Sequence, residues 1–343
     1  PLFVMLLGEV SRWTGDLDLV NRLLPAADAA IRWVIDRGER DPSGFVAYER
    51  SHPGGLENQG WKDSWDGIRR GDGSVVRGRI ALCEVQGYAF AAYRARAELA
   101  RTLGDDRTAT EMDARAEDLA RRFEDAFWLP EQGWYAVGLD SDDAPIDSLT
   151  SNIGHLLWSG IVSPERARTV AARLVSPEMF TGWGVRTLSS ANPGYNPLSY
   201  HCGSVWPHDS ALVAAGLARY GLDREAGSIA RGLIDASRHT GGRLPELFGG
   251  FHRDELPQPV PYPTSCSPQA WSAAAPLLLI RSILGLRPDM PRRRLRLRPR
   301  LPEGIGRLSL TQLALAGSTV TITAEGDHVE VTGLPSDVEV VIE

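Results

Sequence analysis

Apolar residues recur at helical spacing over most of the chain up to about residue 286. This spacing is typical of amphipathic helices. It predicts helices over residues 1–14, 18–38, 78–103, 105–127, 148–158, 163–175, 204–219, 222–239 and 266–284. Two short strands are expected at 44–48 and 133–137. The first part of the chain is therefore predicted to be mainly helical.

The predicted helices come in pairs, in which a helix with one polar face is followed by a more apolar helix. Long loops recur after the polar-faced helices, at 39–77, 128–147, 176–203 and 240–265. Ordered loops of this length are usually functional. The pattern favours an all-α fold, an α/α toroid whose long loops build a pocket at one end. A helical solenoid is the alternative, but the sequence shows no repeat of the usual length.

The pattern changes to alternation with period two from about Arg294. Alternating segments such as Leu295–Arg298 and Val320–Thr323 are separated by glycines and by Pro335. They predict a small antiparallel β tail of four or five strands. We therefore expect two domains, a helical domain over residues 1–290 and a β tail over 291–343.

Composition narrows the class of protein. The 343 residues carry a net charge of −7, which argues against nucleic acids and anionic membranes as partners. No apolar run approaches the roughly 20 residues of a membrane span. The three cysteines show no metal-binding spacing, so we expect free thiols, a reducing cytoplasmic location and no metal. The first residue is not methionine, which suggests the interior of a longer protein.

The loop Glu57–Gly67 combines three acids, two tryptophans and Lys62, the only lysine of the chain. Tryptophan presents an apolar face that can stack on a sugar ring. Glycoside hydrolysis needs a pair of carboxyl groups. An ammonium group beside Asp63, in a chain that otherwise uses arginine, indicates a specific chemical requirement. The alternative is a solvated loop anchored by its tryptophans.

A second candidate segment, 195–209, leads into the predicted helix at 204–219. Ser204 is a plausible N-cap, and Pro207 is tolerated in a first turn. The helix start would present Trp206, His208 and Asp209 to a ligand. The alternative is a helix cap packed against the neighbouring loop.

The third candidate segment is the glycine-rich loop Gly241–Gly250. It places Glu246 directly after Pro245, which suits a general base that holds a water molecule. The alternative is an ordinary loop glutamate.

Together these segments resemble the helical catalytic domain of the amylo-α-1,6-glucosidases, which are glycogen debranching enzyme-like members of the six-hairpin glycosidase superfamily. The resemblance covers about residues 1–290 and is carried by 58–67, 200–209, 245–248 and 268–271. It implies an (α/α)6 barrel and inverting hydrolysis, with Asp63 as the acid and Glu246 as the base. It also implies that the first three barrel helices lie upstream of Pro1, so that the toroid is incomplete at its N-terminus.

The leading hypothesis is an inverting hydrolase of α-glucosides or related α-linked oligosaccharides, including α-1,6 branch points. It needs no cofactor. We expect stacking faces and hydrogen-bonding groups around the substrate from Trp61, Trp65, Trp206, Phe248, Lys62, Asp66, Gln86, His208 and Asp209. The alternatives are a sugar phosphorylase, an epimerase and a barrel that binds carbohydrate without catalysis.

Overall fold

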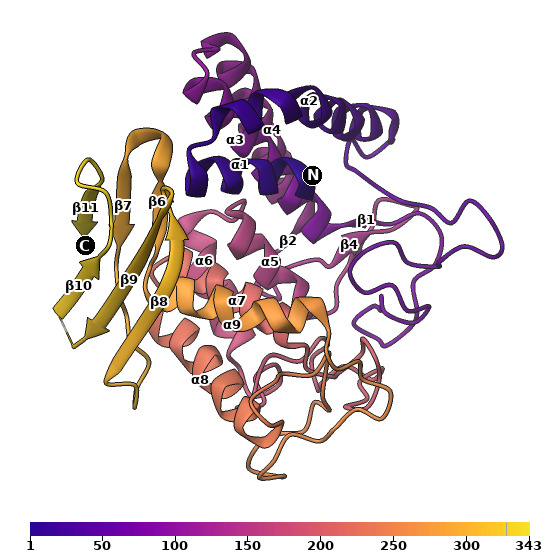
Figure 1. Cartoon of the computed structure of the whole chain (residues 1–343). Coiled ribbons are helices and arrows are strands. Elements are labelled where there is room, and N and C mark those ends of the chain that lie inside the picture. Colours follow the sequence, from indigo (N-terminus) through magenta and orange to yellow (C-terminus); the bar gives the residue numbers. More distant parts are fainter. Residues whose placement is uncertain (327) are drawn as a thin grey trace. The chain divides into compact units, whose positions relative to one another are not determined.

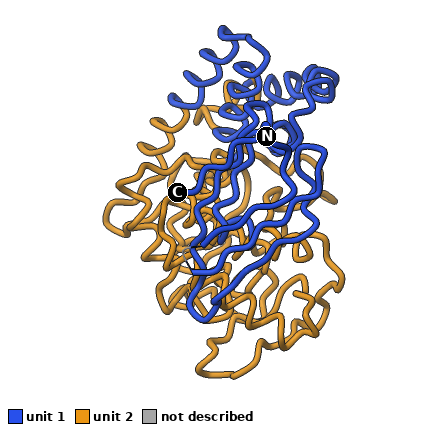
Figure 2. Tube along the Cα trace, turned by 60° about the vertical axis from the view of Figure 1, so that its left-hand side comes forward, with its two compact units in different colours: residues 1–35, 88–118, 280–343 blue, residues 36–87, 119–279 orange. Residues whose placement is uncertain are grey.

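The computed structural model describes residues 1–326 and 328–343. It divides into two compact units, which Figure 2 shows in different colours. Unit 1 comprises residues 1–35, 88–118 and 280–343, and unit 2 comprises 36–87 and 119–279. Four helices contribute residues to both units, because each boundary, at 35/36, 87/88, 118/119 and 279/280, falls inside a helix.

All the predicted helices are present in the described residues. They are α1 Leu2–Thr14, α2 Leu17–Arg40, α3 Cys83–Thr102, α4 Asp106–Phe127, α5 Asn152–Ser159, α6 Pro164–Leu174, α7 Pro207–Arg219, α8 Asp223–His239 and α9 Ala270–Ile283 (Figure 1). The predicted C-terminal ends are close to the observed ones, but several helices begin later than predicted. Closure of these helices into an (α/α)6 toroid stays a prediction.

In unit 1, helix α1 packs closely against α3. A Cβ atom added to Gly8 would lie 3.0 Å from the Cβ atom of Ala95, so the two backbones approach where both side chains are small. Arg12 forms an ion pair with Glu98 of α3 beside this contact. The small apolar contact and the partly buried ion pair together hold α1 on α3.

The C-terminal part of unit 1 forms two three-stranded sheets. Their strands are β6 Arg287–Asp289, β7 Arg294–Leu297, β8 Arg307–Leu315, β9 Ser318–Glu325, β10 His328–Thr332 and β11 Glu339–Ile342. The sheet orders are β10-β9-β8 and β11-β7-β6. Alternate residues of β7 and β9, such as Leu295 and Ile322, are buried in one shared core. The period-two pattern therefore did mark the buried face of these strands.

The prediction of a purely antiparallel tail was wrong for one pair of strands. β11 runs parallel to β7, with Glu339 opposite Arg294. β6 already occupies the other edge of β7 in antiparallel register. The chain returns through residues 333–338 and can reach only the free edge of β7. From Arg294 onward the described residues form five strands, β7 to β11, which agrees with the four or five expected.

In unit 2, helices α5 and α7 approach each other at two glycines. A Cβ atom added to Gly216 of α7 would lie 2.6 Å from the backbone nitrogen of Trp158, and one added to Gly154 of α5 would collide with Val213. Short antiparallel pairings complete the unit: β1 Ala81–Leu82, β4 Gly138–Leu139 and β5 Pro145–Ile146 in one sheet, and β2 Trp128–Leu129 with β3 Trp134–Tyr135 in another.

Helix α3 begins at Cys83, later than predicted, because the residues before it pair as strands. Tyr48 and Ile80 exchange both backbone hydrogen bonds, at 3.0 and 2.9 Å. Ala81 and Leu82 then pair with β4. The strand predicted at 44–48 is accordingly reduced to the bridge at Tyr48.

Helix α7 begins at Pro207. The prediction that Ser204 caps this helix was wrong. Trp206 occupies the N-cap position. Val205 exchanges two backbone hydrogen bonds with Phe248, at 2.9 and 3.0 Å, which keeps the chain extended there. The Ser204 hydroxyl donates to the carbonyl of Tyr200 at 2.7 Å instead of capping the helix.

Successive backbone bridges join the long loops of unit 2. They link Arg186 to Val205, Val205 to Phe248, and Phe248 to Pro261. Segments far apart in the sequence are thereby fixed side by side. In Figure 1 these loops gather beside the end of α9 that begins at Ala270. The three candidate segments meet in this region.

We expect Gly216→Ala to lower the free energy of unfolding by about 1–3 kcal/mol, since the added methyl group meets backbone atoms that cannot rotate away. Gly38→Ala is the matched control, because Gly38 is also helical and an added Cβ there has only ordinary contact, 3.5 Å from the carbonyl of Gly44. It should be neutral or stabilising by about 0.5–1 kcal/mol. Denaturant unfolding measures both; equal effects would contradict the packing described.

Candidate active site

Asn58 closes the first candidate loop into a compact turn. Its side chain is fully buried, and Oδ1 accepts a hydrogen bond from the Tyr48 hydroxyl at 2.7 Å. Its Nδ2 donates to the carbonyl of Ser64 at 2.7 Å. Gly60 passes so close to Leu82 that any side chain would collide. The loop therefore has one well-determined path over the start of α3.

Trp61 lies at the centre of a cluster of rings. His155 of α5 is stacked against it, with ring centroids 5.7 Å apart. His201, Trp206 and His208 meet it edge-on at 5.6, 5.9 and 5.1 Å. Trp61 is consequently half-buried, and Trp206 is 3% exposed and donates from Nε1 to the carbonyl of Tyr200. Both tryptophans are packed mainly against protein.

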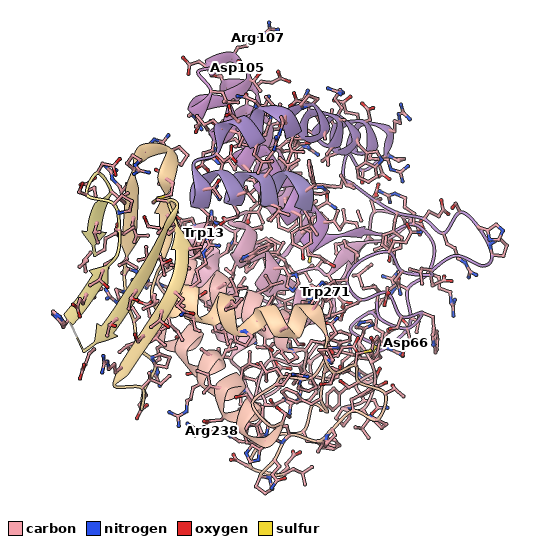
Figure 3. All side chains as sticks on the ribbon, in the orientation of Figure 1. Trp13, Asp66, Asp105, Arg107, Arg238 and Trp271 are labelled. Carbon is pink, nitrogen blue, oxygen red and sulfur yellow. The ribbon has the colours of Figure 1, made fainter. Side chains whose placement is uncertain are left out.

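The exposed aromatic faces belong to Trp65 and Trp271, which are 60% and 48% exposed. Trp271 lies in the first turn of α9, where Figure 3 labels it together with Asp66. Its ring centroid is 4.4 Å from that of His208. The sequence predicted Trp65 as a stacking residue but gave Trp271 no role, although its segment formed part of the resemblance.

Glu246 is held in a fixed position by two donors. It is 8% exposed. Its Oε1 accepts from the Tyr200 hydroxyl at 2.7 Å, and its Oε2 accepts from the backbone N–H of Cys266 at 2.9 Å. Both bonds suit an ionised carboxylate, which only accepts hydrogen bonds. Tyr200 is a functional candidate that the sequence did not single out, because a tyrosine two residues before a Cys-Gly pair carries no motif of its own.

The Tyr200 phenol is also influenced by the charges of both predicted catalytic carboxylates. Burial raises the pKa of Tyr200, and so do the hydrogen bond to Glu246 and the charges of Glu246 and Asp63. The two predicted catalytic carboxylates therefore lie in the electrostatic reach of one phenol, although they are far apart in the sequence. The loops that carry Asp63 and Glu246 are thus brought together, as their candidate roles require.

Asp63 differs from the other acids of its loop. Glu57 pairs with Arg50 and Arg77 at 2.8 and 3.4 Å. Asp66 pairs with Arg69 at 3.4 Å. Within the described residues Asp63 has no ion pair, and it is exposed. Of the three acids, Asp63 is therefore the one whose carboxyl group no described arginine engages and which a ligand can reach.

Lys62 does not lie where a sugar hydroxyl could meet it. Its side chain is 1% exposed, and Nζ donates to the carbonyl of Thr187 at 2.5 Å. Burial lowers the pKa of Lys62, against the opposing charges of Asp209 and Glu84. The structure thus corrects the expectation of a direct substrate contact and favours a supporting role for this ammonium group.

Three other predicted contact residues are also engaged with protein. Gln86 is fully buried and bonds the backbone of Val46 and Leu82. Phe248 is 1% exposed and belongs to the backbone bridges described above. Asp209 is fully buried, with Oδ1 2.8 Å from Nε2 of His155. These residues lie beneath the exposed groups and shape their positions.

The pKa of Asp209 reflects this pairing. Burial would raise it, but the hydrogen bond from His155 and the charges of His155 and Lys62 outweigh burial and lower it. Asp209 therefore remains ionised inside the protein. The sequence missed His155 because it lies inside an apolar helix with no motif around it.

His201 and His208 are neutral in the folded protein. Burial lowers the pKa of His201 to about 3, and the charges of Lys62 and His208 act in the same direction. Burial lowers the pKa of His208 to about 4. His201 Nδ1 lies 2.9 Å from the Ser64 hydroxyl, so it positions the candidate loop. Within the described residues no group of His, Cys, Asp and Glu has the arrangement of a metal site.

Comparison of the sequence with known proteins identifies a family. A family model described as the mannosylglycerate hydrolase MGH1-like glycoside hydrolase domain matches residues 2–251. A second, the C-terminal domain of glycosyl hydrolase family 65, matches residues 290–343. A mannosylglycerate hydrolase from Rubrobacter radiotolerans is 34% identical over 150 residues, which are 42% of this chain and 33% of that protein. The chain thus matches about a third of the length of this relative.

Solved structures share the fold at low sequence identity. A sialidase superposes on 97% of this chain and 31% of its own, with a TM-score of 0.73 and 14% identity. A GH78 family rhamnosidase of Bacillus sp. GL1 covers 99% of this chain and 32% of its own, with a TM-score of 0.68 and 19% identity. These findings support the six-hairpin glycosidase superfamily but not a debranching enzyme in particular.

No described helix is long and apolar enough to cross a membrane.

The two neutral histidines predict how stability depends on pH. The pKa of His201 is about 3 and that of His208 about 4 in the folded protein, whereas an unfolded chain gives histidine a pKa of about 6.5. Between the folded and the unfolded pKa, the unfolded chain therefore binds more protons than the folded protein. The free energy of unfolding should fall as the pH drops from about 6.5 to about 4, by up to about 1.4 kcal/mol per pH unit for each histidine.

Urea unfolding at several pH values measures this slope. His208→Gln should reduce the slope, whereas Trp271→Phe, which alters a neighbouring ring but removes no titrating group, should leave it unchanged. A slope in His208→Gln equal to that of the wild type would contradict the assignment.

Proposed function

This chain belongs to the mannosylglycerate hydrolase MGH1-like glycoside hydrolase family, and on that premise we propose that it hydrolyses α-linked glycosides by a single, inverting displacement. Mannosylglycerate, named in the relative that shares 34% identity over 150 residues, is the first substrate to test. The α-glucosides and α-1,6 branch points expected from the sequence are the second group.

The observation that carries the proposal is that the loops bearing Asp63 and Glu246 both contact residues 200–201. Glu246 accepts the hydrogen bond of the Tyr200 hydroxyl at 2.7 Å, and His201 Nδ1 lies 2.9 Å from the hydroxyl of Ser64, the residue after Asp63. The exposed rings of Trp65 and Trp271 come from two of the segments that meet here. A pair of carboxylates near apolar rings is the arrangement that glycoside hydrolysis uses.

In the proposed reaction, Asp63 protonates the glycosidic oxygen of the leaving group while its C–O bond breaks. Glu246 accepts a proton from a water molecule, whose oxygen forms the new bond to the anomeric carbon from the opposite side. Room for this water requires carboxyl groups roughly 6.5–9.5 Å apart, against about 5–5.5 Å for a retaining pair. The bonds from Tyr200 and Cys266 orient Glu246 for this role.

We expect Asp63→Asn and Glu246→Gln each to lower kcat by about 10²–10⁴-fold, because each removes one proton transfer. Glu57→Gln is the control, since it removes a carboxylate of the same loop that is paired with Arg50 and Arg77. The assay uses mannosylglycerate, α-linked disaccharides and glycogen limit dextrin, with proton NMR of the first-formed sugar. An α-linked substrate should give the β-anomer first, and the α-anomer would falsify the inverting mechanism.

Tyr200→Phe should lower kcat by about 10–100-fold, because it removes a hydrogen bond to a charged group worth about 1.5–3 kcal/mol. Tyr262→Phe is the matched control, since its ring lies 5.8 Å from that of Tyr200 but no hydroxyl bond to Glu246 is lost. Initial rates at saturating substrate measure the difference. Equal activity of the two variants would exclude an orienting role for Tyr200.

A further inference from the structure

Lys62 is the only lysine of the chain, and it is buried between two residues of the candidate active site, Trp61 and Asp63. Removing an ammonium group from water costs free energy, and the lowered pKa of Lys62 reflects that cost. A fully exposed lysine at this position would avoid this cost of burial. The proposed reaction assigns Lys62 no proton transfer, so its burial needs another explanation.

The partner of Lys62 is itself a junction of backbone bonds. The Thr187 carbonyl accepts from Nζ at 2.5 Å, and Thr187 N donates to the carbonyl of Ser204 at 2.9 Å. The Thr187 hydroxyl accepts from the N–H of Gly203 at 2.9 Å. Lys62 thus ties its loop to the segment that leads from Tyr200 into α7.

Charges on several elements face this ammonium group. Asp209 at the start of α7 and Glu84 at the start of α3 favour its charged form. Both carboxylates are buried, and Oε1 of Glu84 and Oδ2 of Asp209 have no hydrogen-bond partner among the described residues. The positive charge of Lys62 therefore balances two buried acids without being locked into a direct pair with either.

The neighbouring residue points the other way. Lys62 is 1% exposed, whereas Asp63 is exposed. Anchoring Lys62 inside the protein consequently fixes the backbone from which the Asp63 side chain reaches the surface, where the proposed substrate binds.

We propose that Lys62 is a positioning residue, whose buried ammonium group fixes residues 61–66 on Thr187 and thereby presents Asp63 to the glycosidic oxygen. The inference rests on the proposed function for the role of Asp63, but the anchoring of the loop is independent of it. Arginine cannot replace Lys62 simply, because a planar guanidinium brings five donors into a site that offers few acceptors.

Lys62→Met tests the anchor, since it keeps the length of the side chain and removes the charge and the bond to Thr187. Hydrogen exchange followed by mass spectrometry should show the amides of 61–66 exchanging at least about 10-fold faster, with α7 and α8 unchanged. Arg166→Met is the matched control, because Arg166 pairs with Glu124 in the same unit, away from this loop. Unchanged exchange of 61–66 in Lys62→Met overturns the proposal.

Activity tests the consequence for Asp63. With an active wild type, Lys62→Met should lower kcat by about 100-fold with little change in KM, since misplacement of an acid by about 1 Å has effects of that size. Faster exchange together with unchanged kcat would also overturn the proposal. If the wild type hydrolyses no glycoside, the proposed function fails, and the exchange measurement still decides whether Lys62 anchors the loop.

The double variant Lys62→Met/Glu84→Gln covers the case in which the single variant does not fold, because it removes one of the two acids left without a counter-charge. Its loop should exchange at least about 10-fold faster than that of the wild type, since the bond to Thr187 is still absent. Restored protection of 61–66 and a wild-type kcat would show that Lys62 acts only through charge balance, and would overturn the anchoring role.

Discussion

The candidate site depends on the backbone bonds that join Val205 to Phe248. These bonds hold two loops in extended form beside each other, and the bridges to Arg186 and Pro261 extend the same contact. Buried backbone groups must be paired, and here they are paired between loops that lie far apart in sequence. The positions of Tyr200, Trp206 and Glu246 follow from this pairing.

The buried ionisable side chains around these paired loops differ in their charge. His201 and His208 are kept neutral by burial among aromatic rings. Asp209 stays charged because His155 and Lys62 compensate for its burial. Such buried polar groups are costly unless satisfied. Their concentration around Trp61 is the pattern expected where a site matters more than stability.

The candidate site therefore has two layers. Asp63, Trp65 and Trp271 are exposed and can meet a ligand directly. Lys62, Gln86, Asp209 and Phe248 are buried beneath them with bonds to protein groups. The motif of residues 57–67 contains residues of both layers in adjacent positions, since Lys62 is buried and Asp63 is exposed. Within one motif, some residues can therefore contact a ligand while others support the loop from inside the protein.

The sequence by itself determined the helices, the period-two face of the C-terminal strands and the segments that carry the candidate chemistry. These features depend on local spacing, which one segment expresses without its neighbours. Only the tertiary structure decided that Lys62 is buried, that Tyr200 binds Glu246, and that β11 lies parallel to β7. Each depends on which distant backbone groups pair, and that pairing leaves no periodic trace in the sequence. For the same reason α3 and α7 begin later than the sequence predicted. The backbone groups of Ile80 and Val205 are bonded to distant segments, so residues that local propensity assigns to helices are extended instead.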